Sequence, residues 1–475
     1  MLNTILIAYL LLSLAMSAAQ LVNRNALVCR ILIGLFIAAQ VTLTLFTAKW
    51  LGMPGNDYFA IDGLGVLLTI VVTIVCVAAF CHSRRYIVEK EGDKDSKVRA
   101  QYYSAMTTIT MALSLASLSA HLAVTWIFVE VTTLSASAMI FYRRTPSSIE
   151  ATWKYVFACS VSLVLVYVGI LFTSISMGAN AEDGLSFATL KSRAGELDTV
   201  WLQMAFIFIF VGYTAKMGLA PMFTAGIDAK DAAPTPAAAI LSSVVMNAGF
   251  VGFFRFYAIV AQTSAYGWSR IVVLVTGVVS IFVAAVYLVK VHNVKRLFAY
   301  SSVEHIGVVM LGIAAGGVGV YAAILHIVLH SFAKSAVMMH VGELFRIYGS
   351  KQLSHMGRYI NKSGTGAAIV IIGLLCVTAM PPSGMFITEL MVFKSLIDVR
   401  WWVSLTLTLI LLCVIVWAIS KDLLSMLFLP AEGPELVKKP EHKFPVIEAL
   451  WQTALLGLSI WWGLWTPDYI ASLVK

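Results

Sequence analysis

Ionisable side chains stand inside long apolar runs of this sequence, where charge is costly. Lys216 lies near the end of VWLQMAFIFIFVGYTAKMGLAPMF, and Glu130 lies within TWIFVEVTTLSA. Lys334 follows the run HIVLHSFA, and Glu389 follows a Pro-Pro break. Ionisable residues inside a bilayer are expensive and mark ion or proton pathways. We therefore interpret these four residues as carriers of transported protons.

Lys216 and Glu130 could work as a pair. A carboxylate close to a buried ammonium stabilises its protonated form, so Glu130 could act as a switch on Lys216. The alternative is a buried ion pair that only fixes helix packing, although such pairs add little stability over apolar substitutes.

Three further residues recur every four positions, so they share one face of a helix: His326, His330 and Lys334. Histidine changes charge near neutral pH, which suits a proton relay, and His305 is expected to join the same row. Polar packing is one alternative. A metal site is another, but no Glu follows the first His as in H-E-x-x-H, and the sequence reveals no third ligand.

Four more residues are candidates for proton uptake or release. Lys154 is either one half of a loop ion pair or an uptake residue. Lys295 is either a solvated charge that sets topology or an uptake residue. Glu304 belongs to the histidine row or pairs with a nearby cation, and Lys394, one turn beyond Glu389, could lead protons out.

Composition places the chain in the membrane class. Hydrophobic residues make up 60% of it and charged residues 12%, and the net charge of +9 comes from basic residues in short loops. That distribution is typical of membrane topology and not of nucleic-acid binding. The six cysteines are scattered without a C-x-x-C pair, which disfavours iron–sulfur clusters and zinc ribbons. We expect no cofactor, no metal and no catalytic centre in this chain.

The apolar runs predict an all-α integral membrane protein with about fourteen spans, because a span needs about 20 apolar residues. The predicted spans are 2–21, 29–48, 62–82, 103–118, 121–141, 155–177, 201–222, 237–260, 269–290, 298–316, 320–345, 366–393, 401–428 and 449–470. Lys and Arg concentrate in the loops after odd-numbered spans, which predicts that both termini lie on the outer side. The location expected is a bacterial or archaeal-type cell (inner) membrane.

Spans seven and twelve are predicted to be broken. Lys216 is followed by Pro221 and by GIDAKDAAPTP, and the twelfth span contains a Pro-Pro-Ser-Gly interruption. Interrupted helices at corresponding places in two halves point to inverted repeats. We expect two inverted five-helix repeats, spans 4–8 and 9–13. The segments are then 1–102 (three helices), 103–260 and 261–428 (the repeats), and 429–475 (a cytoplasmic loop and the last helix).

Several stretches resemble a known family. KMGLAPMFTAGIDAKDAAPTPAAAILSSVVMNAGFVGFFRF, VHNVKRLFAYSSVEHIGVVM and PPSGMFITELMVFK are similar, in this order, to parts of the antiporter-like subunits of respiratory complex I, Mrp-type antiporters and energy-converting hydrogenases. The Glu304-His305 pair and HSFAKS most resemble hydrogenase-4 component F-like subunits of membrane-bound nickel–iron hydrogenases.

The resemblance implies roles for particular residues. Glu130 matches the family's fifth-span glutamate, Lys216 its seventh-span lysine, Lys334 its eleventh-span lysine and Glu389 the ionisable residue of its twelfth span. Asn247 stands where complex I subunits often carry a lysine. The chain also departs from the family at Phe223 and Ala225, which replace the usual histidine and tryptophan.

The function expected is a proton-translocating subunit of a multi-subunit redox complex, of the energy-converting hydrogenase or complex I-related type, that binds no redox cofactor itself. Its partners would be other membrane and peripheral subunits of a hydrogenase-like or complex I-like assembly, together with lipids, and no nucleic acid. The alternatives are a cation/proton antiporter subunit without a redox partner and a membrane subunit of an inorganic-carbon uptake complex. A quinone-reducing enzyme is a further alternative, which the scattered cysteines disfavour.

Overall fold

The computed structural model describes residues 2–23, 25–53, 55–91, 96–178, 184–433 and 444–474. Within these ranges the chain is helical, and strand pairing is limited to isolated β-bridges. The chain divides into two compact units, each described here by itself. Unit 1 comprises Met1–Ala237, Val244–Val272 and Ser472–Lys475, and unit 2 comprises Ala238–Ser243 and Val273–Ala471.

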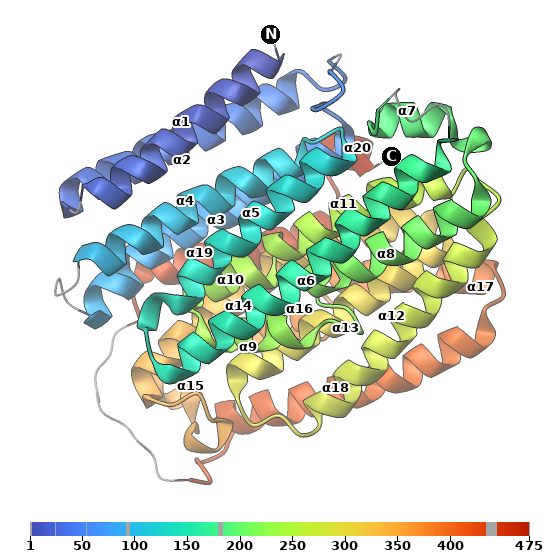
Figure 1. Ribbon diagram of the computed structural model, residues 1–475. Helices are drawn as coiled ribbons and strands as arrows, with labels where there is room; N and C mark the ends of the chain where they lie inside the picture. Colours follow the sequence, from blue (N-terminus) through green and yellow to red (C-terminus); the bar gives the residue numbers. More distant parts are fainter. Residues whose placement is uncertain are drawn as a thin grey trace. The chain divides into compact units, whose positions relative to one another are not determined.

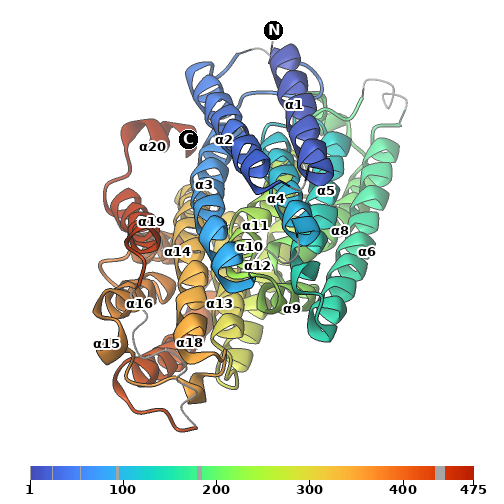
Figure 2. The same cartoon turned by 90° about the vertical axis from the view of Figure 1, so that its left-hand side faces the viewer.

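Unit 1 is built from the first half of the chain. Its helices are α1 (Leu2–Val22), α2 (Ala26–Lys49), α3 (Gly63–Glu91), α4 (Ser96–Ser117), α5 (Leu122–Ile140), η2 (Phe141–Arg143), α6 (Pro146–Ser176), α7 (Phe187–Ser192), η4 (Ala194–Glu196), α8 (Thr199–Met217), α9 (Thr224–Ala232) and α11 (Val244–Val260). The helices α5, α6 and α8 pack side by side, and α11 packs against α8 (Figure 1). The pair α1 and α2 packs against α3 and α4 (Figure 2).

Unit 2 surrounds one long helix. Its helices are α13 (Val294–Ala315), α14 (Val318–Tyr348), η5 (Leu353–His355), α15 (Tyr359–Lys362), α16 (Gly364–Val377), α17 (Gly384–Asp398), α18 (Trp402–Phe428) and α19 (Val446–Leu464). Three helices contribute residues to both units: α10 (Thr235–Ser242), α12 (Tyr266–Leu288) and α20 (Asp468–Val474). The helix α14 packs against α13, α16, α17 and α19, and its most apolar stretch is fully buried (Figure 2).

The predicted break in the seventh span is present. The helix α8 ends at Met217, where Gly218 adopts a left-handed φ of 76° and its N–H bonds to the Thr214 carbonyl. Gly tolerates this conformation without steric cost, which makes it a common helix terminator. Pro221 follows, and the chain resumes as α9 at Thr224.

The predicted break in the twelfth span is present as well. The helix α16 ends at Val377, and α17 begins at Gly384 with Ser383 as its N-cap, whose side chain accepts from the Met385 N–H. A helical Val377 carbonyl would bond to the N–H of residue 381, but Pro381 has no N–H. The break therefore leaves the Val377 carbonyl available to another donor.

Eleven helices among the described residues are long and apolar enough to cross a membrane. The other three predicted spans coincide with α4, with the interrupted pair α16 and α17, and with α19. The predicted last span runs too far, because α19 ends at Leu464, before Pro467. The count of fourteen, the inverted repeats and the segment boundaries stay predictions, and residues 434–443 of the predicted cytoplasmic loop lie outside the described residues.

Candidate functional site

Lys216 is buried at the end of α8, with 4% of its surface exposed. Its Nζ donates to the Thr132 hydroxyl at 3.3 Å and to the Tyr155 hydroxyl at 3.1 Å. The same Nζ lies 5.2 Å from the centre of the Tyr155 ring, within cation–π range. Because these hydrogen-bond partners are neutral hydroxyls, loss of the ammonium proton does not leave a hydrogen-bonded carboxylate without its cation.

The helix α11 approaches α8 closely at this lysine. A Cβ added at Gly249 would lie 2.8 Å from the Lys216 Cβ, so only glycine fits there. Asn247 lies two residues earlier on α11 and is buried.

Glu130 lies on α5, partly buried, in the same neighbourhood. Its carboxylate accepts from the Thr133 and Ser160 hydroxyls, each at 3.2 Å. It interacts electrostatically with Lys216 and with Tyr155. The Lys216 ammonium and the Glu130 carboxylate thus each bond to one hydroxyl of α5 and one of α6.

Lys154 lies on the surface of α6. Its side chain is about half exposed, at 52%, and pairs with Glu150 at 2.6 Å and with Asp228 of α9 at 3.7 Å. It is thus an ion-paired residue that reaches the segment beyond the break after Lys216.

Lys230 was missed by the sequence reasoning, although it lies in the polar segment that follows the break. It is buried on α9, and its Nζ lies 3.5 Å from the Met246 sulfur at the start of α11. Lys230 is thus a second buried lysine of unit 1, after Lys216, and its hydrogen-bond acceptor is a weak one, a thioether sulfur. The clue in the sequence was the segment GIDAKDAAPTP itself, which is polar between two apolar runs.

The ionisable residues of unit 2 meet at the crossing of α13, α14 and α17. His305 Nδ1 and His326 Nε2 lie 3.2 Å apart in hydrogen-bond geometry. The ring of His330 lies 5.3 Å from that of His305, centre to centre. All three imidazoles are fully buried, so the structure brings together the histidines that the sequence placed in one row.

The outer nitrogens of the pair fix its tautomers. His305 Nε2 lies 2.9 Å from the Val377 carbonyl, which can only accept, so this nitrogen carries a hydrogen. The Thr388 hydroxyl donates to the Met385 carbonyl at 2.9 Å, so its oxygen accepts from His326 Nδ1 at 2.8 Å. In two neutral rings, His305 Nδ1 and His326 Nε2 would then both carry lone pairs, and these would repel each other at 3.2 Å. One additional proton between the two nitrogens replaces this repulsion with a hydrogen bond.

Two carboxylates border the imidazole pair. Glu304 Oε1 lies 3.4 Å and Glu389 Oε1 lies 3.9 Å from His305 Nδ1. Both side chains are buried, and Glu304 Oε2 and Glu389 Oε1 have no hydrogen-bond partner among the described residues. Glu304 is thus a member of the histidine row. A buried carboxylate without a donor is costly when charged, which favours exchange of a proton with the neighbouring rings.

The same group also has the spacing of a cation site. Ligand atoms of His305, His326 and Glu389 all lie within 4.8 Å of one another. The sequence suggested His326 and His330 as the possible metal-binding pair, whereas the structure groups His326 with His305 and Glu389. The hydrogen-bond geometry between the two ring nitrogens favours a proton as the occupant.

Lys334 continues the row along α14. It is fully buried, and its Nζ donates to the Phe298 carbonyl at 3.1 Å and to the Ser301 hydroxyl. It interacts electrostatically with both Glu304 and His305. Helix α14 therefore carries a lysine and two histidines on the face that meets α13.

Comparison with known proteins decides the family. A sequence model described as NADH:quinone oxidoreductase/Mrp antiporter, transmembrane, matches residues 119–415, which is more than half of the chain. The chain belongs to this family. It is an antiporter-like, multi-pass membrane subunit of the kind found in complex I-type, Mrp-type and hydrogenase-type complexes.

Both the sequence relatives and the structural neighbours agree with this family assignment. A hydrogenase-4 component F homolog from Methylacidiphilum infernorum is 28% identical over 348 residues, which cover 72% of this chain and 73% of the relative. A chain of the Mrp complex from Dietzia sp. superposes with a TM-score of 0.85 at 15% identity, covering 100% of this chain and 97% of that one. A chain of an archaeal membrane-bound sulfane sulfur reductase gives 0.82 at 19% identity, with 100% and 96% covered. These two structures share the fold.

The remaining candidates of this antiporter-like subunit lie at the ends of helices. Lys295, in the first turn of α13, is buried, so the interpretation as a solvated topology charge is wrong. Lys394 on α17 is exposed, at 65%, and pairs with Asp398 one turn further on at 3.1 Å. It lies on the helix that carries Glu389.

A second polar network of unit 2 was missed by the sequence reasoning. Arg346, near the end of α14, bonds to both carboxylate oxygens of Glu448 on α19, at 2.8 and 3.1 Å, and to Glu343 at 3.3 Å. His340 bridges Gln452 of α19 at 2.8 Å and the Tyr359 hydroxyl at 3.1 Å. The spacing of His340, Glu343 and Arg346, three residues apart, was the available clue, because it places them on one helix face.

Proposed function

We propose that this subunit moves protons across the membrane through the buried residues of its two units. In unit 1 the carriers are Glu130, Lys216 and Asn247. In unit 2 they are His305, His326, His330, Lys334 and Glu389. Lys154, Lys295, Glu304 and Lys394 serve uptake or release.

The observation that carries the proposal is the imidazole pair of unit 2. His305 and His326 are held by fixed partners so that their inner nitrogens can share one proton at 3.2 Å. Glu304 and Glu389 can receive that proton, because their carboxylate oxygens lie 3.4 and 3.9 Å from the same ring nitrogen. A proton that two imidazoles share beside two carboxylates forms a relay, because small changes of local charge decide which of these groups holds the proton.

The relatives support one kind of partner complex. One relative is named as a hydrogenase-4 component F homolog, and this supports a redox-driven complex of the energy-converting hydrogenase type. Electron transfer in other subunits would shift the charge balance around Glu130 and Lys216, and protons would cross as the carriers change partners. The chain would lie in a bacterial or archaeal-type cell membrane with both termini outside.

The test uses the native complex reconstituted into sealed vesicles, with redox-driven proton movement followed by a pH-sensitive dye. Lys216→Ala and Glu130→Gln are expected to abolish proton movement while subunit composition and electron transfer remain. Lys421→Ala, which removes an exposed lysine of α18, serves as the control. Full pumping by both variants would refute the assigned roles.

The same vesicles distinguish the alternatives. A cation/proton antiporter subunit without a redox partner would exchange sodium for protons in the absence of any electron donor. A subunit of an inorganic-carbon uptake complex would co-purify with a soluble zinc protein instead of a hydrogenase-like large subunit. The proposal expects neither result.

A further inference from the structure

Unit 1 contains a pocket of about 320 Å³ between α2, α3 and α4, and none of the proton carriers lines it. Its polar lining consists of Arg30 from α2, Arg84 from α3, and Arg99 and Tyr103 from α4. Its apolar lining includes Ile33, Ile37 and Phe80. One small cavity thus combines three guanidinium groups with a hydrocarbon surface.

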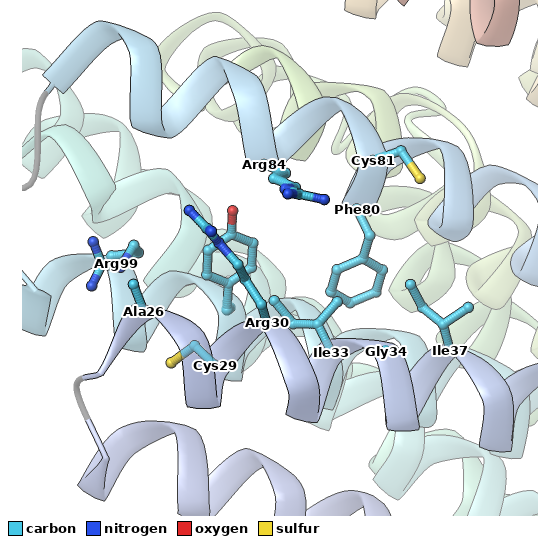
Figure 3. Close-up of a pocket in the computed structure, with 11 residues that line it drawn as sticks. Ala26, Cys29, Arg30, Ile33, Gly34, Ile37, Phe80, Cys81, Arg84 and Arg99 are labelled. Atoms are coloured by element: carbon cyan, nitrogen blue, oxygen red, sulfur yellow. The ribbon is translucent and has the colours of Figure 1, made fainter. Parts of the chain in front are cut away.

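The charged and apolar lining are only partly separated. Arg99 lies toward one end of the pocket, Arg30 and Arg84 lie near its middle, and Ile37 lies toward the other end (Figure 3). The Tyr103 hydroxyl interacts electrostatically with Arg30, Arg84 and Arg99, so the cations surround one point. Among the described residues that line the pocket, none is acidic. The occupant that complements it has a negative head and an apolar tail.

The surroundings give the tail a route. Only 22% of the apolar window of α2 is buried, and Gly34, which lines the pocket, has no atom within 4 Å of an added Cβ. The slot along α2 is therefore open toward the surface that faces hydrocarbon. The arginines lie where α2 begins, α3 nears its end and α4 begins, which is the predicted cytoplasmic end of these helices.

We propose that this pocket binds an anionic phospholipid. Its phosphate would lie between the guanidiniums of Arg30, Arg84 and Arg99, which suit planar, bidentate recognition of phosphate oxygens. One acyl chain would run past Gly34 along Ile37 and Phe80. Basic pockets between spans on the cytoplasmic side have the chemistry that recognises such headgroups. The residues that line this site are different from the proton carriers.

The test is native mass spectrometry of the full chain, stripped of lipid and then incubated with cardiolipin or with phosphatidylcholine. The parent chain is expected to retain cardiolipin in preference to phosphatidylcholine. The variant Arg30→Gln/Arg84→Gln should lower cardiolipin retention by about tenfold or more, because it removes charge-assisted hydrogen bonds. The control Lys351→Gln/Lys421→Gln removes the same charge elsewhere and should retain the lipid.

A second variant tests the tail. Gly34→Leu keeps all three arginines and fills the slot, and leucine is a better helix former than glycine, so folding is preserved. It should lower cardiolipin retention as well. Unchanged retention in Gly34→Leu, together with displacement by inorganic phosphate, would assign a free anion and overturn the proposal. Equal losses in the control, or loss of a neighbouring subunit from the native complex without any change in bound lipid, would overturn it too.

Discussion

At the scale of single residues, neutral groups decide what the charged ones can do. The Thr388 hydroxyl accepts from His326 Nδ1, and the Val377 carbonyl accepts from His305 Nε2. Neither residue titrates, yet together they direct two ring nitrogens at each other. Thr388 is therefore a positioning residue for the imidazole pair.

Replacing Thr388 tests this role. Thr388→Val keeps the shape of the side chain but removes the oxygen, so His326 is free to take the other tautomer. We expect about tenfold slower proton movement, in line with the roughly 1–3 kcal/mol that an unsatisfied buried polar group costs. The measurement is the dye assay in vesicles, together with the pH profile of the rate. Thr388→Ser restores the hydroxyl and should restore both, and a Val variant with the parent pH profile would contradict the role.

The sequence predicted many of these residues but not their neighbours. His326, His330 and Lys334 were predictable because one helix with a repeat of four residues places them on one face. Thr388 and Tyr155 were missed for a physical reason. Hydroxyls are common in spans, and which of them face a charge depends on how helices pack, which a single sequence does not encode locally.

At the scale of helices, the interruptions and close approaches position the site. Both broken spans were predictable from proline, because a residue without an N–H cannot continue a helix. The contact of α11 with α8 was not, since Gly249 became meaningful only when its place opposite Lys216 was known.

Gly249→Ala tests this approach. The added methyl group would lie 2.8 Å from the Lys216 Cβ, so α8 and α11 must separate or the lysine must shift. We expect proton movement to fall by about tenfold, because overpacking typically costs ~1–3 kcal/mol. The assay is the same vesicle measurement, with assembly checked by subunit composition. Gly226→Ala on α9, where an added Cβ meets no atom within 4 Å, is the matched control, and equal rates in both variants would contradict the role.

At the scale of the whole molecule, composition and hydropathy were sufficient for the membrane class, whereas the family resemblance depended on motifs such as PPSGMFITELMVFK. Composition and hydropathy were less informative where spans are interrupted or polar. The helix α4 is rich in hydroxyl residues, and α16 and α17 are each short, so these helices are not among the eleven described helices that are long and apolar enough to cross a membrane. The division into two units at Ala237 and Val272 has no marker in composition.

The predicted orientation can be measured in cells. The excess of Lys and Arg in loops after odd-numbered spans predicts that both ends of the chain lie outside. Alkaline phosphatase fused after the last residue should be active there, and a green fluorescent protein fused at the same point should be dark. Insertion of the fluorescent protein at Ser350, in an odd-numbered loop, should give the opposite result. A dark insertion at Ser350 with a bright terminal fusion would reverse the topology.

The carbonyl of Val377 has a property that sets it apart from every other partner of the imidazole pair. It belongs to the main chain, and Pro381 leaves it without its helical donor. A systematic exchange of side chains for alanine would remove the hydroxyl of Thr388 but would pass over this oxygen at position 377. The contribution of this oxygen would be detected only by replacing Pro381, a residue that does not itself carry a proton.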